Sequence, residues 1–86
     1  KDNKNKQSNV TYSVLVGNYE QYKIALDYKR MLSKEGFLCR IEDVQLNGQN
    51  FYALKIGYYK NKKTAENILK RLKSRVGITN ATILEN

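Results

Sequence analysis

The sequence predicts an α+β domain in which a four-stranded antiparallel sheet carries two helices on one face, in the order βαββαβ. One observation behind this prediction is a strand-to-helix pattern that occurs twice, forty positions apart. The other is a pair of shorter apolar alternations, one after each predicted helix. Short connections and right-handed crossovers then place the two repeated strands side by side in the middle of the sheet.

An internal duplication defines the first strand and helix and their second copies. It runs through both the strand pattern and the helix pattern, so it is longer than one short motif. The residues of the first copy are Tyr12, Val14, Val16, Gly17, Tyr19, Ala25, Tyr28 and Leu32, which return as Tyr52, Leu54, Ile56, Gly57, Tyr59, Ala65, Ile68 and Leu72. Two related halves therefore make one domain.

Each copy begins as a strand and continues as a helix. In the first copy, Tyr12, Val14 and Val16 alternate as they would on one face of a strand. After Tyr19 the apolar spacing changes to three and four residues, which is typical of a helix with one buried stripe. The predicted stripe of the first helix consists of Ile24, Ala25, Tyr28, Met31 and Leu32.

Single residues mark where these elements begin and end. Gly36 and Gly77 can adopt the left-handed backbone that ends many helices, and Asn61 offers a side-chain oxygen that caps the second helix. Tyr19 and Tyr59 stand at the entry to each helix, and we expect them to pack beneath the sheet rather than contact a ligand.

Two further strands complete the sheet. Asn47 and Gly48 suit the positive backbone angles of a tight hairpin turn. The turn pairs a strand at residues 38–45 antiparallel with the repeated strand at residues 51–57. Residues 79–84 supply the last strand.

The length of 86 residues allows one small domain with one core. Residues 1–9 contain no apolar residue, so we interpret them as the end of a solvated linker and residues 10–86 as the domain. Because the chain begins with Lys1 rather than Met, we expect a larger protein upstream, and any membrane contact is expected to belong to that parent protein.

The formal net charge is +8, from 16 lysine and arginine residues against 8 aspartate and glutamate residues. Long-range electrostatics therefore favours an anionic partner, such as nucleic acid, anionic lipid or an acidic wall polymer. The alternative is that the lysines reflect the composition of the parent protein and keep the domain soluble.

The sequence contains few residues that could carry catalysis. Histidine is absent, and the single cysteine, Cys39, falls on the inward face of its predicted strand, where free cysteine usually behaves as a small hydrophobe. The adjacent carboxylates Glu42 and Asp43 point to opposite faces, so a paired acid and base is not expected. We therefore predict no enzyme activity, no metal site and no cofactor.

One face of the sheet is left open if both helices cover the other. Strand alternation assigns to this open face Ser13, Leu15, Arg40, Glu42, Phe51, Ala53, Lys55, Thr82 and Leu84. Leu15 and Phe51 then form an exposed apolar strip with cationic neighbours, which is a candidate binding surface. The alternative is a slip of one residue that turns Phe51 toward the core. We favour Tyr52 inward, because it is the repeat partner of Tyr12.

The same residues resemble a known family. They comprise YSVLVGNY at residues 12–19, YALKIGYY at residues 52–59, and the positions Ala25, Leu32, Gly36, Phe37, Ala65 and Leu72. This ordered set, doubled at the same spacing, resembles the SPOR (sporulation-related repeat) domain. The resemblance covers nearly everything from residue 10 to residue 84.

The resemblance implies a ferredoxin-like fold and binding to bacterial peptidoglycan, with a preference for glycan strands that lack stem peptides. Such strands arise at the division septum, so it also implies an extracytoplasmic location, in the periplasm or cell wall, and a role in targeting a larger protein there. A monomer is expected. In the family the ligand lies across the open sheet face. The glycan contacts expected here are Ser13, Leu15, Asn18, Arg40, Phe51, Ala53, Lys55 and Thr82.

The sequence departs from the family at several of these positions. The family often has Gln where Leu15 stands, Ser where Asn18 stands and Arg where Ala53 stands. Two hydrogen-bonding groups are therefore missing from the central strands. Some members carry Trp in place of Phe51, which agrees with an aromatic contact at that position.

Two other functions remain open. RNA-recognition motifs share this order of strands and helices and stack bases on exposed aromatics of the central strands, and a charge of +8 suits that use. However, GQNFYALK at residues 48–55 lacks the dense aromatic and basic signature of those motifs, so no nucleic-acid partner is expected. The second alternative is a protein-docking domain whose open face contacts another chain.

Overall fold

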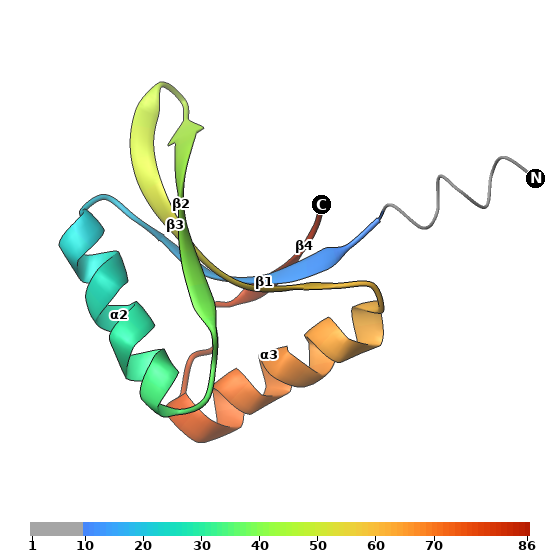
Figure 1. The fold of residues 1–86 in the computed structure, drawn as a ribbon. Helices are drawn as coiled ribbons and strands as arrows, with labels where there is room; N and C mark the ends of the chain where they lie inside the picture. The colour runs from blue at the N-terminus through green and yellow to red at the C-terminus, as the bar shows by residue number, and fades with distance from the viewer. Residues whose placement is uncertain (1–9) are drawn as a thin grey trace, which may run out of the picture.

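A computed structural model describes residues 10–86 and confirms the α+β architecture and the order βαββαβ (Figure 1). The segment interpreted as a linker, residues 1–9, lies outside the described residues. The elements are β1 (Tyr12–Tyr19), α2 (Tyr22–Lys34), β2 (Cys39–Leu46), β3 (Gln49–Tyr59), α3 (Lys62–Val76) and β4 (Thr82–Glu85). Neither helix in residues 10–86 is long and apolar enough to cross a lipid bilayer.

The strands form one antiparallel sheet in the order β2-β3-β1-β4, with both helices on the same side (Figure 1). The two repeated strands, β1 and β3, are neighbours in the middle, as predicted. Their register is reciprocal, because Tyr12 pairs with Tyr59 and Tyr19 pairs with Tyr52. The two halves are therefore related by an approximate twofold axis that passes between the central strands.

The core fills the space between the sheet and the helices. Its buried residues from these elements include Val14, Val16, Leu54, Ile56, Leu32, Ala65 and Leu72. Tyr19, Tyr59 and Cys39 pack against this cluster, which confirms that they lie beneath the sheet. Burial raises the pKa of the Cys39 thiol to about 11, so the thiol stays neutral near neutral pH and packs as a small apolar group.

The position of Tyr52 settles which residues of β3 face the helices. Its ring lies edge-on against Tyr22 of α2, with the ring centroids 5.5 Å apart and the planes at 76°. Since successive strand residues alternate, Phe51 projects to the opposite side. The alternative in which Phe51 enters the core is wrong.

The predicted chain reversals are confirmed. Asn61 Oδ1 accepts a hydrogen bond from the backbone N–H of Lys63 at 2.9 Å, and Gly77 ends α3 with a φ of 73°. Asn47 and Gly48 have φ values of 55° and 79°. These positive angles allow the tight turn that joins β2 to β3.

Three strands differ from their predicted bounds. β2 runs one residue later than predicted, at Cys39–Leu46 instead of residues 38–45. β3 begins at Gln49 rather than at residue 51 and continues past its predicted end at Gly57 to Tyr59. Gly57 adopts a φ of 74°, and register shifts between β1 and β3 absorb the irregularity. β4 begins at Thr82 rather than at residue 79. The chain first turns back at the end of α3, where the backbone N–H of Ile78 donates to the Leu72 carbonyl at 3.2 Å.

The buried stripe of α2 is narrower than its apolar pattern. Ala25 and Leu32 are buried, whereas Ile24, Tyr28 and Met31 are exposed. A helix packed on one sheet buries only the residues that point at that sheet. Helical spacing therefore predicted the correct face of α2 and overestimated its buried width.

Candidate functional site

The open face is the side of the sheet that carries no helix. Strand register brings four of the predicted contacts into one row that crosses all four strands, in the order Arg40, Lys55, Leu15 and Thr82. Directly paired residues of antiparallel strands project to the same side of a sheet. Leu15 and Lys55 are partly exposed and Thr82 is exposed, so this row is at the surface.

Two further rows extend the open face toward the β2–β3 hairpin. Ala53 pairs with Glu42 on one side and with Asn18 on the other, and in the next row Phe51 pairs with Val44. Phe51 and Val44 are both partly exposed. Val44 was not among the residues predicted for the open face, and it enlarges the apolar surface beside Phe51.

Two predicted contacts, Ser13 and Ala53, lie on the open face but are covered. Ser13 has no exposed surface and Ala53 is 1% exposed. The Ser13 hydroxyl donates to the Gly57 carbonyl at 2.5 Å, and it accepts hydrogen bonds from Arg40 Nη2 at 3.2 Å and Asn86 Nδ2 at 2.9 Å. The Ala53 methyl group lies between longer side chains on the flanking strands. In this arrangement both residues form the floor of the face and contribute almost no exposed surface to it.

A network of polar side chains occupies the middle of the open face. The Glu42 carboxylate accepts hydrogen bonds from Arg40 Nε at 2.6 Å and from Lys55 Nζ at 2.8 Å. The Tyr58 hydroxyl donates to the same carboxylate at 3.3 Å. The Arg40 guanidinium also stacks on the Tyr58 ring, 3.7 Å from its centroid. The network therefore ties β2 to β3 across the surface.

The network keeps Glu42 ionised. Hydrogen bonds from Lys55 and then from Arg40 lower the pKa of Glu42 from 4.5 to about 2. The carboxylate is therefore charged at any pH well above that value, and it offers no proton for general-acid chemistry near neutral pH.

We expect acid to weaken the domain through this carboxylate. Because the pKa of Glu42 is lower in the folded chain, its contribution to stability is present above pH 4.5 and is lost as the pH falls toward about 2. Urea unfolding of the natural domain and of Glu42→Gln should show the gap between their stabilities closing over that interval. A gap that stays constant would contradict the assignment.

Sequence reasoning missed two members of the network, Tyr58 and Asn86. Tyr58 is the repeat partner of Asn18, forty positions on, so the duplication held a signal that could have placed it on the open face. Asn86 lies beyond the predicted last strand and carried no such signal. Its side chain donates to Ser13 Oγ and, at 3.0 Å, to Thr11 Oγ1.

Most of the positive charge of the described residues lies away from the open face. α3 carries six basic residues and one acidic residue, and it packs on the opposite side of the sheet. Register and hydrogen bonding place two cations, Arg40 and Lys55, and one anion, Glu42, on the open face, which gives a local net charge of about +1. The overall charge of +8 is therefore not concentrated there.

The family model described as SPOR domain matches residues 8–84, which is almost the whole chain. The chain belongs to the SPOR domain family. No match was found among curated proteins.

Two solved structures are similar to this SPOR domain. One is the solution structure of the peptidoglycan binding domain of the B. subtilis cell wall lytic enzyme CwlC, at 22% identity and a TM-score of 0.73, with 92% of each chain covered. The other is the crystal structure of a protein of Burkholderia pseudomallei K96243 described as exported, at 20% identity and a TM-score of 0.72. The match covers 88% of this chain and 16% of that one. These similarities confirm the ferredoxin-like fold.

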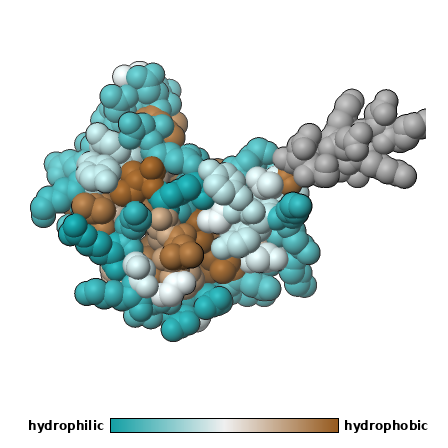
Figure 2. Space-filling model, in the orientation of Figure 1, coloured by the Kyte–Doolittle hydropathy of each residue, from teal (hydrophilic) through white to brown (hydrophobic). Residues whose placement is uncertain are grey.

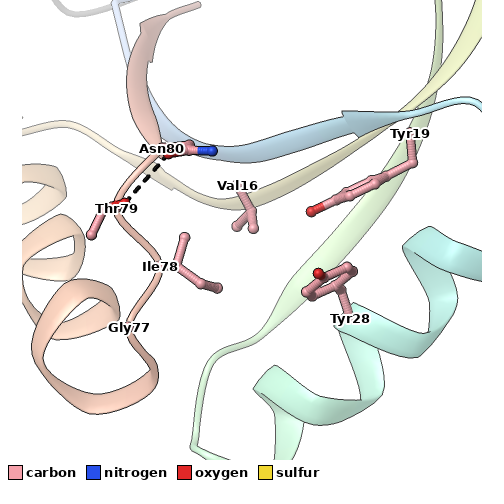
Figure 3. A pocket seen from close by; sticks show the side chains of 7 residues that line it. All are labelled: Val16, Tyr19, Tyr28, Gly77, Ile78, Thr79 and Asn80. Atoms are coloured by element: carbon pink, nitrogen blue, oxygen red, sulfur yellow. Dashed lines mark hydrogen bonds between the residues drawn. The ribbon is translucent and has the colours of Figure 1, made fainter.

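The helix side of the SPOR domain has hollows of its own. Figure 2 shows apolar side chains gathered between the two helices, and a hollow of about 320 Å³ lies between the end of α2, β3 and α3. A second hollow, of about 190 Å³, is bordered by the stacked rings of Tyr19 and Tyr28 opposite Ile78 (Figure 3). In residues 10–86 no three His, Cys, Asp or Glu side chains lie close enough to hold a metal.

Proposed function

We propose that this SPOR domain is a non-catalytic module that binds peptidoglycan glycan strands lacking stem peptides. The observation that carries the proposal is the helix-free face, on which partly exposed Phe51, Val44 and Leu15 lie beside Lys55 and Arg40. The shared fold with a domain whose title calls it peptidoglycan binding supports the same conclusion.

The chemistry of the face suits a glycan. Sugar rings present apolar C–H surfaces that Phe51 can cover, and N-acetyl amides can hydrogen-bond with Asn18, Lys55 or Thr82. Removal of the stem peptide frees a carboxylate on each lactyl group, so the stripped polymer is anionic and sparsely charged. A face with a small net positive charge matches such a polymer.

The proposal assigns no catalytic role to the open face. The carboxylate that the register places there, Glu42, is held between two cations and stays ionised, so it is not poised to exchange protons near neutral pH. Targeting is the role that remains. We infer that the domain acts outside the cytoplasm as a monomer and directs a larger protein to the cell wall, at the division septum.

The experiment that tests this function is co-sedimentation of the isolated domain with peptidoglycan. The domain is expected to sediment with amidase-treated sacculi more strongly than with intact sacculi from the same preparation. Equal sedimentation with both would remove the specificity for stripped glycan, and no sedimentation at modest salt would overturn the proposal.

Phe51→Ala is expected to weaken binding to amidase-treated sacculi about tenfold, or ~1.4 kcal/mol, because the apolar platform for a sugar ring is lost. Tyr22→Ala is the matched control, since it removes an exposed aromatic ring from α2 on the other side of the sheet. Quantitative pull-down isotherms give both affinities. Equal affinities for the two variants would place the ligand elsewhere.

The dependence of binding on salt separates the glycan proposal from nucleic-acid binding. Affinity for nucleic acid falls steeply with salt in proportion to the number of phosphates neutralised. The open face has a local net charge of about +1, so glycan binding there should lose little affinity as salt rises. The same titration with single-stranded RNA provides the comparison, and a steep loss for the glycan would argue against the open face.

A further inference from the structure

Three hydrogen-bond donors converge on one point of the open face. They are Arg40 Nε, Lys55 Nζ and the Tyr58 hydroxyl, and the group that they surround is the carboxylate of Glu42, at 2.6, 2.8 and 3.3 Å. A guanidinium, an ammonium and a hydroxyl around one anion are what a protein uses to bind a carboxylate of a ligand. The arrangement is therefore a carboxylate site that the chain itself fills.

Arg40, one of the three donors, is held in place without Glu42. Arg40 Nη1 donates to the Gly57 carbonyl at 2.9 Å and Nη2 donates to Ser13 Oγ at 3.2 Å, so two of its hydrogen bonds anchor it to the floor of the face. The stacking of Arg40 on Tyr58 adds a third contact. If the Glu42 carboxylate swung away, the guanidinium would keep its position.

Glu42 is accessible from solvent. Its hydrogen bonds in the structure go to these three donors, and its side chain is 34% exposed, compared with 14% for Lys55. It also stands on β2, which is an edge strand, so solvent borders it on one side. A carboxylate arriving from solvent can therefore reach the donors that Glu42 occupies.

We propose that Glu42 is an internal substitute for a ligand carboxylate, and that a lactyl carboxylate of the glycan displaces it from Arg40, Lys55 and Tyr58. This inference rests on the proposed function and adds a specific subsite to it. Since Glu42 competes with the ligand, it lowers affinity for carboxylate-bearing strands. It also cancels one of the two cations, so the face disfavours densely charged polyanions.

The test uses Glu42→Gln, which keeps the shape of the side chain and removes the competing charge. Asp43→Asn is the matched control, because it removes the same charge from the next residue of β2, on the other face and outside the network. The probes are amidase-stripped glycan strands and the same strands after chemical reduction of their carboxyl groups to alcohols. Glu42→Ala provides a second variant, and thermal unfolding verifies that each variant is folded.

Glu42→Gln is expected to bind the carboxylated strands about threefold to fivefold more tightly than the natural domain, with no gain on the reduced strands and no gain for Asp43→Asn. Unchanged or weaker binding by both Glu42 variants, or an equal gain on both polymers, overturns the inference and leaves glycan binding standing. If the natural domain binds neither polymer, the proposed function itself is wrong.

Discussion

Replacing Gly57 with Ala is expected to lower the free energy of unfolding by about 2–5 kcal/mol, through backbone strain and overpacking together. Gly57 has a φ of 74°, a conformation that L side chains rarely adopt. A Cβ added there would overlap the ring of Tyr59, which packs against the core. To make room, the ring would have to shift from its place against the core.

Gly48→Ala separates the two causes, because Gly48 has a φ of 79° and no heavy atom lies within 4 Å of an added Cβ. It should cost only the strain, about 1 kcal/mol. Urea unfolding measures both variants. The Gly57 carbonyl also accepts hydrogen bonds from Ser13 and Arg40, so under the proposed function Gly57→Ala should weaken glycan binding as well. Equal losses of stability for the two glycines would show that the Tyr59 contact is unimportant.

Leu32→Ala and Leu72→Ala are each expected to lower the free energy of unfolding by about 2–5 kcal/mol. The two leucines are repeat partners, one on each helix, and neither has exposed surface. Each truncation removes transfer free energy and leaves a cavity between a helix and the sheet. Because the two halves share one core, unfolding should remain a single transition in both variants.

Leu38→Ala is the control for these truncations. Leu38 is 84% exposed, and the loss of its side chain should change stability by less than about 0.5 kcal/mol. Denaturant melts followed by circular dichroism and by tyrosine fluorescence compare the three variants. A small cost at Leu32 or Leu72 alone, or two separate transitions, would mean that the halves are not one cooperative unit.

The duplication made most of the fold predictable. It marked β1, β3 and both helices by two periodicities at once, and Asn47–Gly48 and Asn61 supplied local signals for a turn and a cap. Alternation then assigned residues to the open face, and the packing of Tyr52 on Tyr22 confirms the phase on β3. The exact ends of β3 and β4 depend on a bulge at Gly57 and on a turn after α3, which alternation does not detect.

The site was less predictable than the fold. Alternation gives the side on which a residue lies but not what covers it, so it could not show that Arg40 and Asn86 seal Ser13. It also could not show that Glu42 would draw Arg40 and Lys55 together, since that depends on register between strands. Net charge is a sum over the chain, so by itself it did not show that the six basic residues of α3 lie on the helix side of the sheet.

The approximate twofold axis between β1 and β3 has a consequence for how a linear polymer can lie on the sheet. Residues related by the axis are unlike on the open face: Leu15 matches Lys55, and Asn18 matches Tyr58. A backbone that is nearly symmetric thus carries side chains that are not. Under the proposed function, the two ends of a glycan strand would therefore meet different side chains, and we expect the two directions of the strand to bind with different affinities.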